Sequence, residues 1–206
     1  MKVLGITGPS GSGKTTLCSI FKENYNATII DADGVAKVLS SNPETEYFKK
    51  MVELFGESIL NDDGSLERKE IAIIIYNDFQ KRDALNKLTF KYVAEDICSQ
   101  VLELKKSDTQ YVVIDVPLLY EAKMENICDK VIAVVAEDKE KILRICRRDN
   151  ISEELARQRL DIQNNNEFFI NKADFVIHNN GMSMDDLKKS LEEIVSKLWV
   201  NGFQEL

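Results

Sequence analysis

Eight residues near the N-terminus have the types and spacing of a phosphate-binding loop. Residues 8–15 read GPSGSGKT and fit the pattern GxxxxGK[ST]. Gly8, Gly11 and Gly13 allow backbone N–H groups to turn inward around a phosphate, and a helix that follows adds partial positive charge at its N-terminus. Lys14 can reach the β and γ phosphates, and the hydroxyl of Thr15 can hold Mg²⁺. The segment predicts a site for a nucleoside triphosphate.

An acidic residue closes an apolar run farther along the chain. Residues 111–114 read YVVI, and Asp115 follows them. An acid that ends a buried strand can lie beside Mg²⁺, usually through a bound water. Asp115 is therefore a candidate for the metal site, and an ordinary polar strand end is the alternative.

Two aspartates follow another apolar run. Asp31 and Asp33 close the run 27–30, which in a parallel sheet ends beside the phosphate-binding loop. Phosphoryl transfer needs a carboxylate that orients the acceptor hydroxyl and takes its proton. Asp33 can do this, or it can cap the helix that follows, because Asp is a favoured N-cap residue.

The arginines are concentrated in one short segment. Five of the seven in the chain are Arg144, Arg147, Arg148, Arg157 and Arg159. From residue 139 to 159 there are seven basic and four acidic side chains, a local +3 in a chain of net charge −8. Arg144 and Arg148 share a helical face, and the planar fork of arginine suits phosphate. These two predict a lid over the triphosphate. The other three fit a solvated helical hairpin, in which Glu153 and Glu154 can pair with Arg157 and Arg159.

Short apolar runs must form the sheet that positions these residues. The runs are 3–6, 27–30, 111–114, 131–135 and 175–177. They are unbroken rather than alternating, which is typical of strands covered on both faces of a parallel sheet. Helical patterns lie between them, and the clearest covers residues 184–198, with Ser183 and Asp186 spaced as a capping box. The alternation predicts an α/β fold of three layers, a P-loop NTPase core with a parallel five-stranded sheet.

The interval 32–110 differs from the rest of the chain. It lacks a clear strand, and its Asn61–Gly64 segment predicts a turn with a helix start at Ser65. We expect a helical substrate-binding insertion at the carboxyl edge of the sheet, where open α/β sheets bind ligands. The predicted organisation is a core of residues 1–31 and 111–206, a helical lid at 139–165, and an acceptor domain at 32–110.

Composition excludes several other classes of protein. With 27 Lys+Arg against 35 Asp+Glu, the chain is too acidic for a simple cationic nucleic-acid binder. No apolar run approaches the ~20 residues of a membrane helix, and the first apolar stretch is too short for a signal peptide. The four cysteines form no CxxC pair, and His178 is the single histidine, so zinc ligands are lacking. We expect reduced thiols and a cytoplasmic location.

The residues by themselves indicate a small-molecule kinase with an unknown acceptor. A nucleotide-binding regulatory or assembly module that hydrolyses slowly is the alternative from another class. Such a module would bind nucleotide without acceptor-dependent turnover, and it would not need Asp33.

Five segments, in order along nearly the whole chain, resemble the dephospho-CoA kinase family. They are GITGPSGSGKTT (5–16), IIDAD (29–33), DVPLLYE (115–121), RRDNISEELARQRLDIQ (147–163) and ADFVIHNNG (173–181). The resemblance implies ATP-dependent phosphorylation of the ribose 3′-hydroxyl of dephospho-CoA, giving coenzyme A and ADP in the last step of coenzyme A synthesis. It also implies a P-loop kinase core, a helical CoA-binding domain and a lid. Another small P-loop kinase, acting on a nucleoside, nucleotide or small metabolite, is the alternative enzyme.

The resemblance also implies the site residues. Asp33 would be the general base for the 3′-hydroxyl, and Arg148 the lid arginine on the phosphates. The ATP phosphate loop would be Gly11, Ser12, Gly13, Lys14, Thr15 and Thr16. The adenine would lie near Arg144, Asn179 and Asn180. The acceptor would lie near Pro117, Leu118, Leu119 and Glu121.

The chain departs from the family pattern at one point that bears on the acceptor. Asn86-Lys87-Leu88 is followed by Thr89-Phe90, where the family commonly has a His-Pro pair. A histidine contact to the acceptor therefore does not carry over to this chain. We expect dephospho-CoA as substrate, no nucleic-acid or membrane partner, and a monomer or small homo-oligomer.

Overall fold

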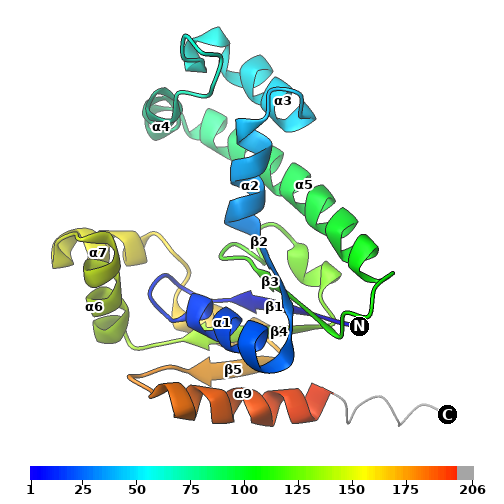
Figure 1. Cartoon of the computed structure of the whole chain (residues 1–206). Coiled ribbons are helices and arrows are strands. Elements are labelled where there is room, and N and C mark those ends of the chain that lie inside the picture. The colour runs from blue at the N-terminus through cyan, green and yellow to red at the C-terminus, as the bar shows by residue number, and fades with distance from the viewer. Residues whose placement is uncertain (199–206) are drawn as a thin grey trace. The chain divides into compact units, whose positions relative to one another are not determined.

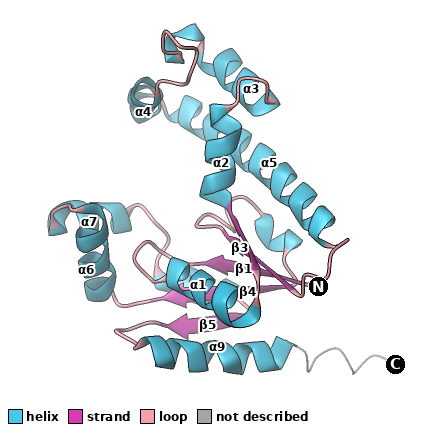
Figure 2. Ribbon diagram, viewed as in Figure 1, coloured by secondary structure: helices cyan, strands magenta, loops and turns pink. Residues whose placement is uncertain are grey.

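A computed structural model, which describes residues 1–198, contains a five-stranded sheet (Figures 1 and 2). The strands are β1 (Lys2–Thr7), β2 (Thr28–Asp31), β3 (Tyr111–Asp115), β4 (Lys130–Val135) and β5 (Phe175–His178). Their order is β2-β3-β1-β4-β5, with β1 parallel to β3 and β4, and β4 parallel to β5. Every predicted apolar run overlaps one strand, and the predicted α/β fold is confirmed. Because β1 is central, the loop that follows it lies where the strand order reverses and ligands bind.

Helices connect the strands and form the intervening segment. They are α1 (Lys14–Tyr25), α2 (Ala32–Ser41), α3 (Glu46–Phe55), η1 (Glu57–Ile59), α4 (Arg68–Asn77), α5 (Phe79–Leu104), η2 (Met124–Ile127), α6 (Asp138–Asp149), α7 (Glu153–Asp161), α8 (Asn166–Lys172) and α9 (Met184–Leu198). Within residues 1–198, no helix combines the length and apolar character that crossing a membrane requires.

The chain divides into two compact units. Among the described residues, the first comprises Met1–Ile29, Asp108–Leu119 and residues 125–198, and it holds β1, β3, β4 and β5 with α1 and α6 to α9. The second comprises Ile30–Ser107 and Tyr120–Met124, and it holds α2 to α5.

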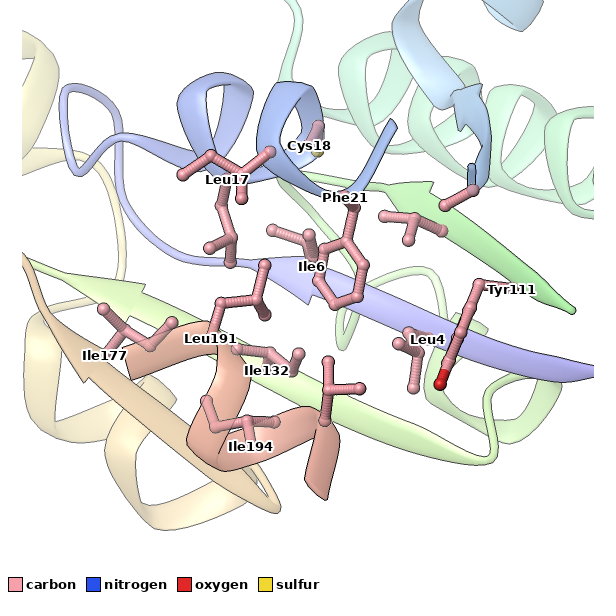
Figure 3. Packing of buried hydrophobic residues seen from close by; sticks show 14 of the residues in the cluster. Leu4, Ile6, Leu17, Cys18, Phe21, Tyr111, Ile132, Ile177, Leu191 and Ile194 are labelled. Carbon is pink, nitrogen blue, oxygen red and sulfur yellow. The ribbon is translucent and has the colours of Figure 1, made fainter. Parts of the chain in front are cut away.

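The core of the first unit lies between the sheet and helices α1 and α9 (Figure 3). Leu4 and Ile6 are two residues apart on β1 and so point to the same face of the sheet. They pack with Leu17 and Phe21 of α1 and with Leu191 of α9. All five side chains are fully buried, and each contributes roughly 1.5–3 kcal/mol to folding. The core therefore holds both ends of the loop that joins β1 to α1.

The last helix follows its predicted pattern. α9 spans Met184–Leu198, and its buried side chains lie at the predicted apolar spacing from Leu187 to Leu198. The Ser183 hydroxyl accepts a hydrogen bond from the backbone N–H of Asp186 at 3.2 Å and donates to its carboxylate at 2.6 Å. Ser183 is therefore the N-cap residue of the helix, and the Asp186 carboxylate accepts a hydrogen bond from the capping hydroxyl.

The second unit has a helical core. Its buried cluster is formed by Tyr47, Met51 and Phe55 of α3, Ile59 of η1 and Ile71 of α4. α5 adds Val93, Ile97 and Val101 as its buried residues.

The helix start predicted at Ser65 is wrong, because α4 begins at Arg68 with Glu67 as its N-cap. Ser65 instead closes the predicted turn. Its hydroxyl donates to the Asp63 carboxylate, and its carbonyl accepts from the N–H of Asn61. These local bonds keep Ser65 in the turn, since serine and aspartate hydrogen-bond to nearby backbone as readily in turns as at caps.

Candidate functional site

The predicted phosphate-binding loop joins β1 to α1 through turns that need glycine. Gly8, Gly11 and Gly13 have φ values of 139°, 76° and 108°, which L side chains rarely adopt. A Cβ on Gly8 would lie 2.0 Å from the carbonyl oxygen of Val134, and one on Gly13 would lie 2.3 Å from Nδ2 of Asn179. The loop therefore packs against the ends of β4 and β5 with no room for larger residues.

The N-terminus of α1 has no side-chain cap. Its N-cap is Gly13, which has no side chain to accept from the N–H groups of the first turn. Such N–H groups bind phosphate, with the helix dipole adding to the attraction. Lys14 Nζ donates to the carbonyls of Gly8 at 2.8 Å and Pro9 at 3.1 Å, so the ammonium lies against the loop backbone. The structure thus brings the motif lysine to the loop, and its contact with phosphate stays a prediction.

Arg144 of α6 is held against the outer side of the same loop. Nη1 donates to the carbonyls of Gly11 and Ser12, each at 3.2 Å, and Nη2 donates to the carbonyl of Asn179 at 2.9 Å. Asn179 is buried, and its Nδ2 donates to the Ser12 carbonyl at 2.8 Å. Arg144 and Asn179 together satisfy the loop carbonyls. Their predicted role near adenine stays untested, and this role in shaping the loop was not predicted.

Asn180 forms its hydrogen bonds with Glu137 and not with the phosphate-binding loop. Its Oδ1 accepts from the N–H of Glu137 at 2.8 Å, and its Nδ2 donates to the Glu137 carboxylate at 3.3 Å. Glu137 is the N-cap residue of α6. Asn180 therefore joins the end of β5 to the start of the predicted lid.

Arg148 also reaches the loop. Its Nη2 donates to the hydroxyl of Ser10 at 3.3 Å, while Nε and Nη2 donate to the two carboxylate oxygens of Asp149 at 2.7 and 3.0 Å. Arg159 of α7 donates to the same carboxylate. Hydrogen bonds from Arg148, with the charges of both arginines, hold the pKa of Asp149 below its ordinary value. Arg148 therefore contacts the loop from α6, and its contact with the triphosphate stays a prediction. Sequence reasoning gave Asp149 no role.

Arg157 and Arg159 of the same segment have different ion-pair partners. Arg157 pairs with Glu153 four residues earlier on exposed α7, as the alternative reading predicts. Arg159 is the exception, since its partner is Asp149 on the other helix. The segment also contributes Gln163, whose Oε1 accepts from the backbone N–H of Ser10 at 2.9 Å.

A buried lysine at the base of α6 escaped sequence reasoning. Lys141 is 3% exposed, and its Nζ donates to Oδ1 of Asn166 at 3.1 Å and lies 2.8 Å from the Asp138 carboxylate. Its backbone also lies so close to Gly11 that a Cβ there would come within 2.6 Å of the Lys141 carbonyl oxygen. The i,i+3 spacing from Asp138 was visible in the sequence, but the burial was not.

The two candidate magnesium ligands lie on different elements, a helix start and a strand end. Thr15 lies in the first turn of α1 and is exposed, and Asp115 is the last residue of β3 and is half-buried. Asp115 is the register partner of Ile6 on β1, two residues before Gly8. A hydroxyl and a carboxylate are hard oxygen donors that suit Mg²⁺. Within residues 1–198, no cluster of three or more acidic, histidine or cysteine side chains forms a metal site of its own.

The structure separates the tasks of the two aspartates after β2. Asp31 is the N-cap of α2, and its Oδ1 accepts from the N–H of Asp33 at 3.1 Å. Asp33 lies inside the first turn with an exposed side chain. The cap function belongs to Asp31, so Asp33 is not the helix N-cap.

The predicted acceptor residues 117–121 divide between the two units. In the first unit, the backbone carbonyl of Pro117 accepts from the Thr7 hydroxyl at 3.4 Å. Leu118 in the same unit is exposed, and Leu119 is buried. Glu121 belongs to the second unit. Thr89, at the position of the departure from the family pattern, pairs with the Tyr47 hydroxyl at 3.0 Å. That pair joins α3 to α5 within the second unit.

Comparison with known sequences gives one family. The model described as "Dephospho-CoA kinase" matches residues 2–185. A dephospho-CoA kinase from Bacillus cereus is 34% identical over 197 residues, which cover 96% of this chain and 96% of the relative. One from Arabidopsis thaliana is 34% identical over 198 residues, which cover 96% of this chain and 84% of the relative.

Solved structures agree with the sequence comparison. A dephospho-CoA kinase from Campylobacter jejuni is 27% identical with a TM-score of 0.67, covering 95% of this chain and 96% of that one. A Thermus thermophilus protein is 25% identical with a TM-score of 0.78, covering 96% of this chain and 97% of that one. Shikimate kinase from Acinetobacter baumannii, 15% identical with a TM-score of 0.57 over 97% of this chain and 96% of that one, shares the fold.

Proposed function

The chain belongs to the dephospho-CoA kinase family, which phosphorylates dephospho-CoA in the last step of coenzyme A synthesis, and we propose that ATP with Mg²⁺ is its phosphoryl donor. The observation that carries the proposal is the loop 8–15. Its Gly11 and Ser12 carbonyls are held by Arg144 and Asn179, and the helix α1 that follows has no side-chain cap at its N-terminus. Lys14 and Arg148 both contact this loop.

Two cations and the helix terminus would share the charge of the triphosphate. Lys14 would leave the carbonyls of Gly8 and Pro9 for the β and γ phosphates, since phosphate oxygens carry more charge than carbonyls. Arg148 would contact the transferred group from the lid, where its fork stabilises charge that grows during transfer. The backbone N–H groups of residues 11–16 would hold the remaining oxygens.

Thr15 and Asp115 would hold the metal. The Thr15 hydroxyl would bind Mg²⁺ directly, and the Asp115 carboxylate would do so through a water. Bound there, Mg²⁺ neutralises charge on the phosphate oxygens.

We assign the acceptor chemistry to Asp33. Its carboxylate is exposed and does not cap α2, because Asp31 is the N-cap residue of that helix. A carboxylate of this kind can orient the 3′-hydroxyl of dephospho-CoA and take its proton. Residues 117–119 and Glu121, with the helical segment 32–110, would bind the rest of the acceptor. Asn179 and Asn180 would line the adenine pocket with Arg144.

The partners and location follow from composition. The net charge of −8 supports a small-molecule substrate rather than a nucleic acid. Four free cysteines support a reducing compartment such as the cytoplasm. We propose that the enzyme acts as a monomer or small homo-oligomer.

An acceptor-dependent assay tests the function. ADP release from ATP and Mg²⁺ is measured with dephospho-CoA, nucleosides, nucleoside monophosphates, gluconate or shikimate, and without acceptor. We expect release to depend on dephospho-CoA, with the product phosphorylated on the ribose 3′-hydroxyl. Turnover with another acceptor would support the alternative kinase, and slow acceptor-independent hydrolysis would support a regulatory module. Omitting Mg²⁺ tests the metal separately.

A further inference from the structure

One carboxylate in the lid segment lies where a helix disfavours it. Asp149 is the last residue of α6 and is followed by Asn150, the left-handed C-cap with φ 53°. The C-terminal end of a helix carries partial negative charge, which repels a carboxylate. Asp149 therefore contributes nothing favourable to the helix itself, and local rules of this kind are broken mainly at functional sites.

The Asp149 carboxylate accepts hydrogen bonds from arginines of two helices, α6 and α7. It accepts from Nε and Nη2 of Arg148 in a two-pronged pair at 2.7 and 3.0 Å, and from Nη1 of Arg159 on α7. The pair with Arg148 directs that side chain to Ser10, whose hydroxyl lies 3.3 Å from Nη2. The carboxylate thus joins α6, α7 and the phosphate-binding loop through one guanidinium.

This geometry leaves part of the Arg148 fork for a ligand. Nε and Nη2 are engaged by Asp149 and Ser10, and within residues 1–198 no group accepts from Nη1. An arginine side chain has many rotamers, so ordering it during the reaction would be unfavourable. A fork that is already oriented meets the phosphate without that loss.

We propose that Asp149 is a positioning residue for phosphoryl transfer, which orients Arg148, with Arg159, toward the triphosphate beside Ser10. The proposal rests on the use of ATP proposed above. Exposed ion pairs add little to stability, and the side chains of Arg148 and Arg159 are 59% and 50% exposed. The effect of Asp149 should therefore appear in the rate of transfer and not in the stability of the fold.

A double-mutant cycle on the full chain tests this. Steady-state kcat and the KM for ATP, with saturating dephospho-CoA, are measured for the wild type, Asp149→Asn, Arg148→Lys and the double variant. We expect Asp149→Asn to lower kcat about tenfold or more, with Tm within about 3 °C of the wild type. In the Arg148→Lys background the same change should lower kcat by less than about twofold, because the fork that Asp149 orients is gone. Glu153→Gln, which removes the partner of Arg157 on the same segment, is the matched control and should leave kcat unchanged.

The outcomes separate this inference from the proposed function. Losses that multiply in the double variant would overturn the positioning role, and so would an unchanged kcat for Asp149→Asn. A lower folded fraction that accounts for the lost rate would also overturn it, which thermal unfolding of each variant reveals. A wild type that shows no turnover with ATP and dephospho-CoA would instead contradict the proposed donor, and with it the positioning role that depends on that donor.

Discussion

The guanidinium of Arg144 donates from Nη2 to the backbone carbonyl of Asn179 at 2.9 Å, across 35 residues of chain. Its Nη1 at the same time holds the carbonyls of Gly11 and Ser12. Peptide groups are planar, so a carbonyl turned outward to Arg144 turns the N–H of the next residue toward the opposite side. The arginine thereby fixes which side of the loop presents its N–H groups to an anion.

Replacing Arg144 with lysine should weaken this arrangement. Lysine keeps the charge but lacks the planar fork, so the Gly11 carbonyl loses its donor. The Ser12 and Asn179 carbonyls lose one of two donors and keep those from Asn179 Nδ2 and the Gly181 N–H. We expect unfolding free energy to fall by about 2 kcal/mol and the KM for ATP to rise, measured by denaturant unfolding and by kinetics. Arg147→Lys, on an exposed position of the same helix, is the control. Equal stability of the two variants would contradict the role of the fork.

Lys14→Ala should lower kcat by on the order of a hundredfold or more, because it removes charge stabilisation from the transferred phosphoryl group. The carbonyls of Gly8 and Pro9 lose a donor, and both residues are buried, so the free energy of unfolding should also fall by about 1–2 kcal/mol. A loss of this size leaves the protein folded and cannot account for the loss in kcat. Lys22→Ala, at the exposed end of the same helix, is the matched control. Near-normal turnover of Lys14→Ala would refute the phosphate contact.

Asp33→Asn should lower kcat strongly and leave the KM for ATP and the unfolding midpoint close to those of the wild type. An asparagine is isosteric but cannot take the proton of the acceptor. Asp31→Ala is the complementary variant, since it removes the N-cap of α2 and should cost about 1 kcal/mol of stability. If Asp33→Asn instead unfolds the protein, the residue has a structural role that the cap geometry does not reveal.

Ser12→Ala should raise stability or leave it unchanged. The Ser12 side chain is 0% exposed, and its Oγ has no hydrogen-bond partner among the described residues. A buried unsatisfied hydroxyl costs about 1–3 kcal/mol, which alanine removes while its Cβ fills the same place. Ser183→Ala, which deletes the α9 cap, should lose about 1 kcal/mol. Denaturant unfolding of both variants gives the comparison, and a destabilised Ser12→Ala would show that the hydroxyl has a partner such as bound water.

The sheet could be predicted because its signals are local. Each buried strand is a short β-branched run, and the glycines at residues 8, 11 and 13 are needed by turns within the loop itself. Residue type alone does not define where a helix begins. Ser65 has the residue type of an N-cap, but its hydroxyl bonds to Asp63 in the turn, and residue type does not decide between these two uses.

The connections within the site could not be predicted because they span long stretches of chain. The contact from Gln163 to Ser10 joins positions 153 residues apart, and the one from Arg144 to Gly11 joins positions 133 apart. Periodicity identifies a helical face but not its partner. The resemblance to a family named Arg144 and Arg148 as site residues, yet it could not show that Arg144 satisfies carbonyls or that Asp149 collects two arginines.

Cys128 should make stability depend on pH in the alkaline range. Burial, with the nearby carboxylates of Asp129, Glu125 and Asp174, raises the pKa of its thiol to about 12 from the ordinary 9.0. Between these values the folded state binds more protons than the unfolded state, so stability falls as pH rises from 9.0 to about 12 and is fully present below 9.0. Burial raises the pKa of Tyr25 and Tyr47 as well, so the difference between the wild type and Cys128→Ala isolates the thiol.

Alkylation gives an independent measurement of the same thiol. The thiolate is the reactive form, so iodoacetamide should modify Cys128 in the folded protein far more slowly than in urea, as followed by peptide mass spectrometry. Cys98 and Cys146, which are half-buried like Cys128, serve as internal controls. Equal rates for Cys128 in the folded and unfolded states would contradict the raised pKa. A parallel loss of stability with pH in Cys128→Ala would assign the alkaline transition to the tyrosines.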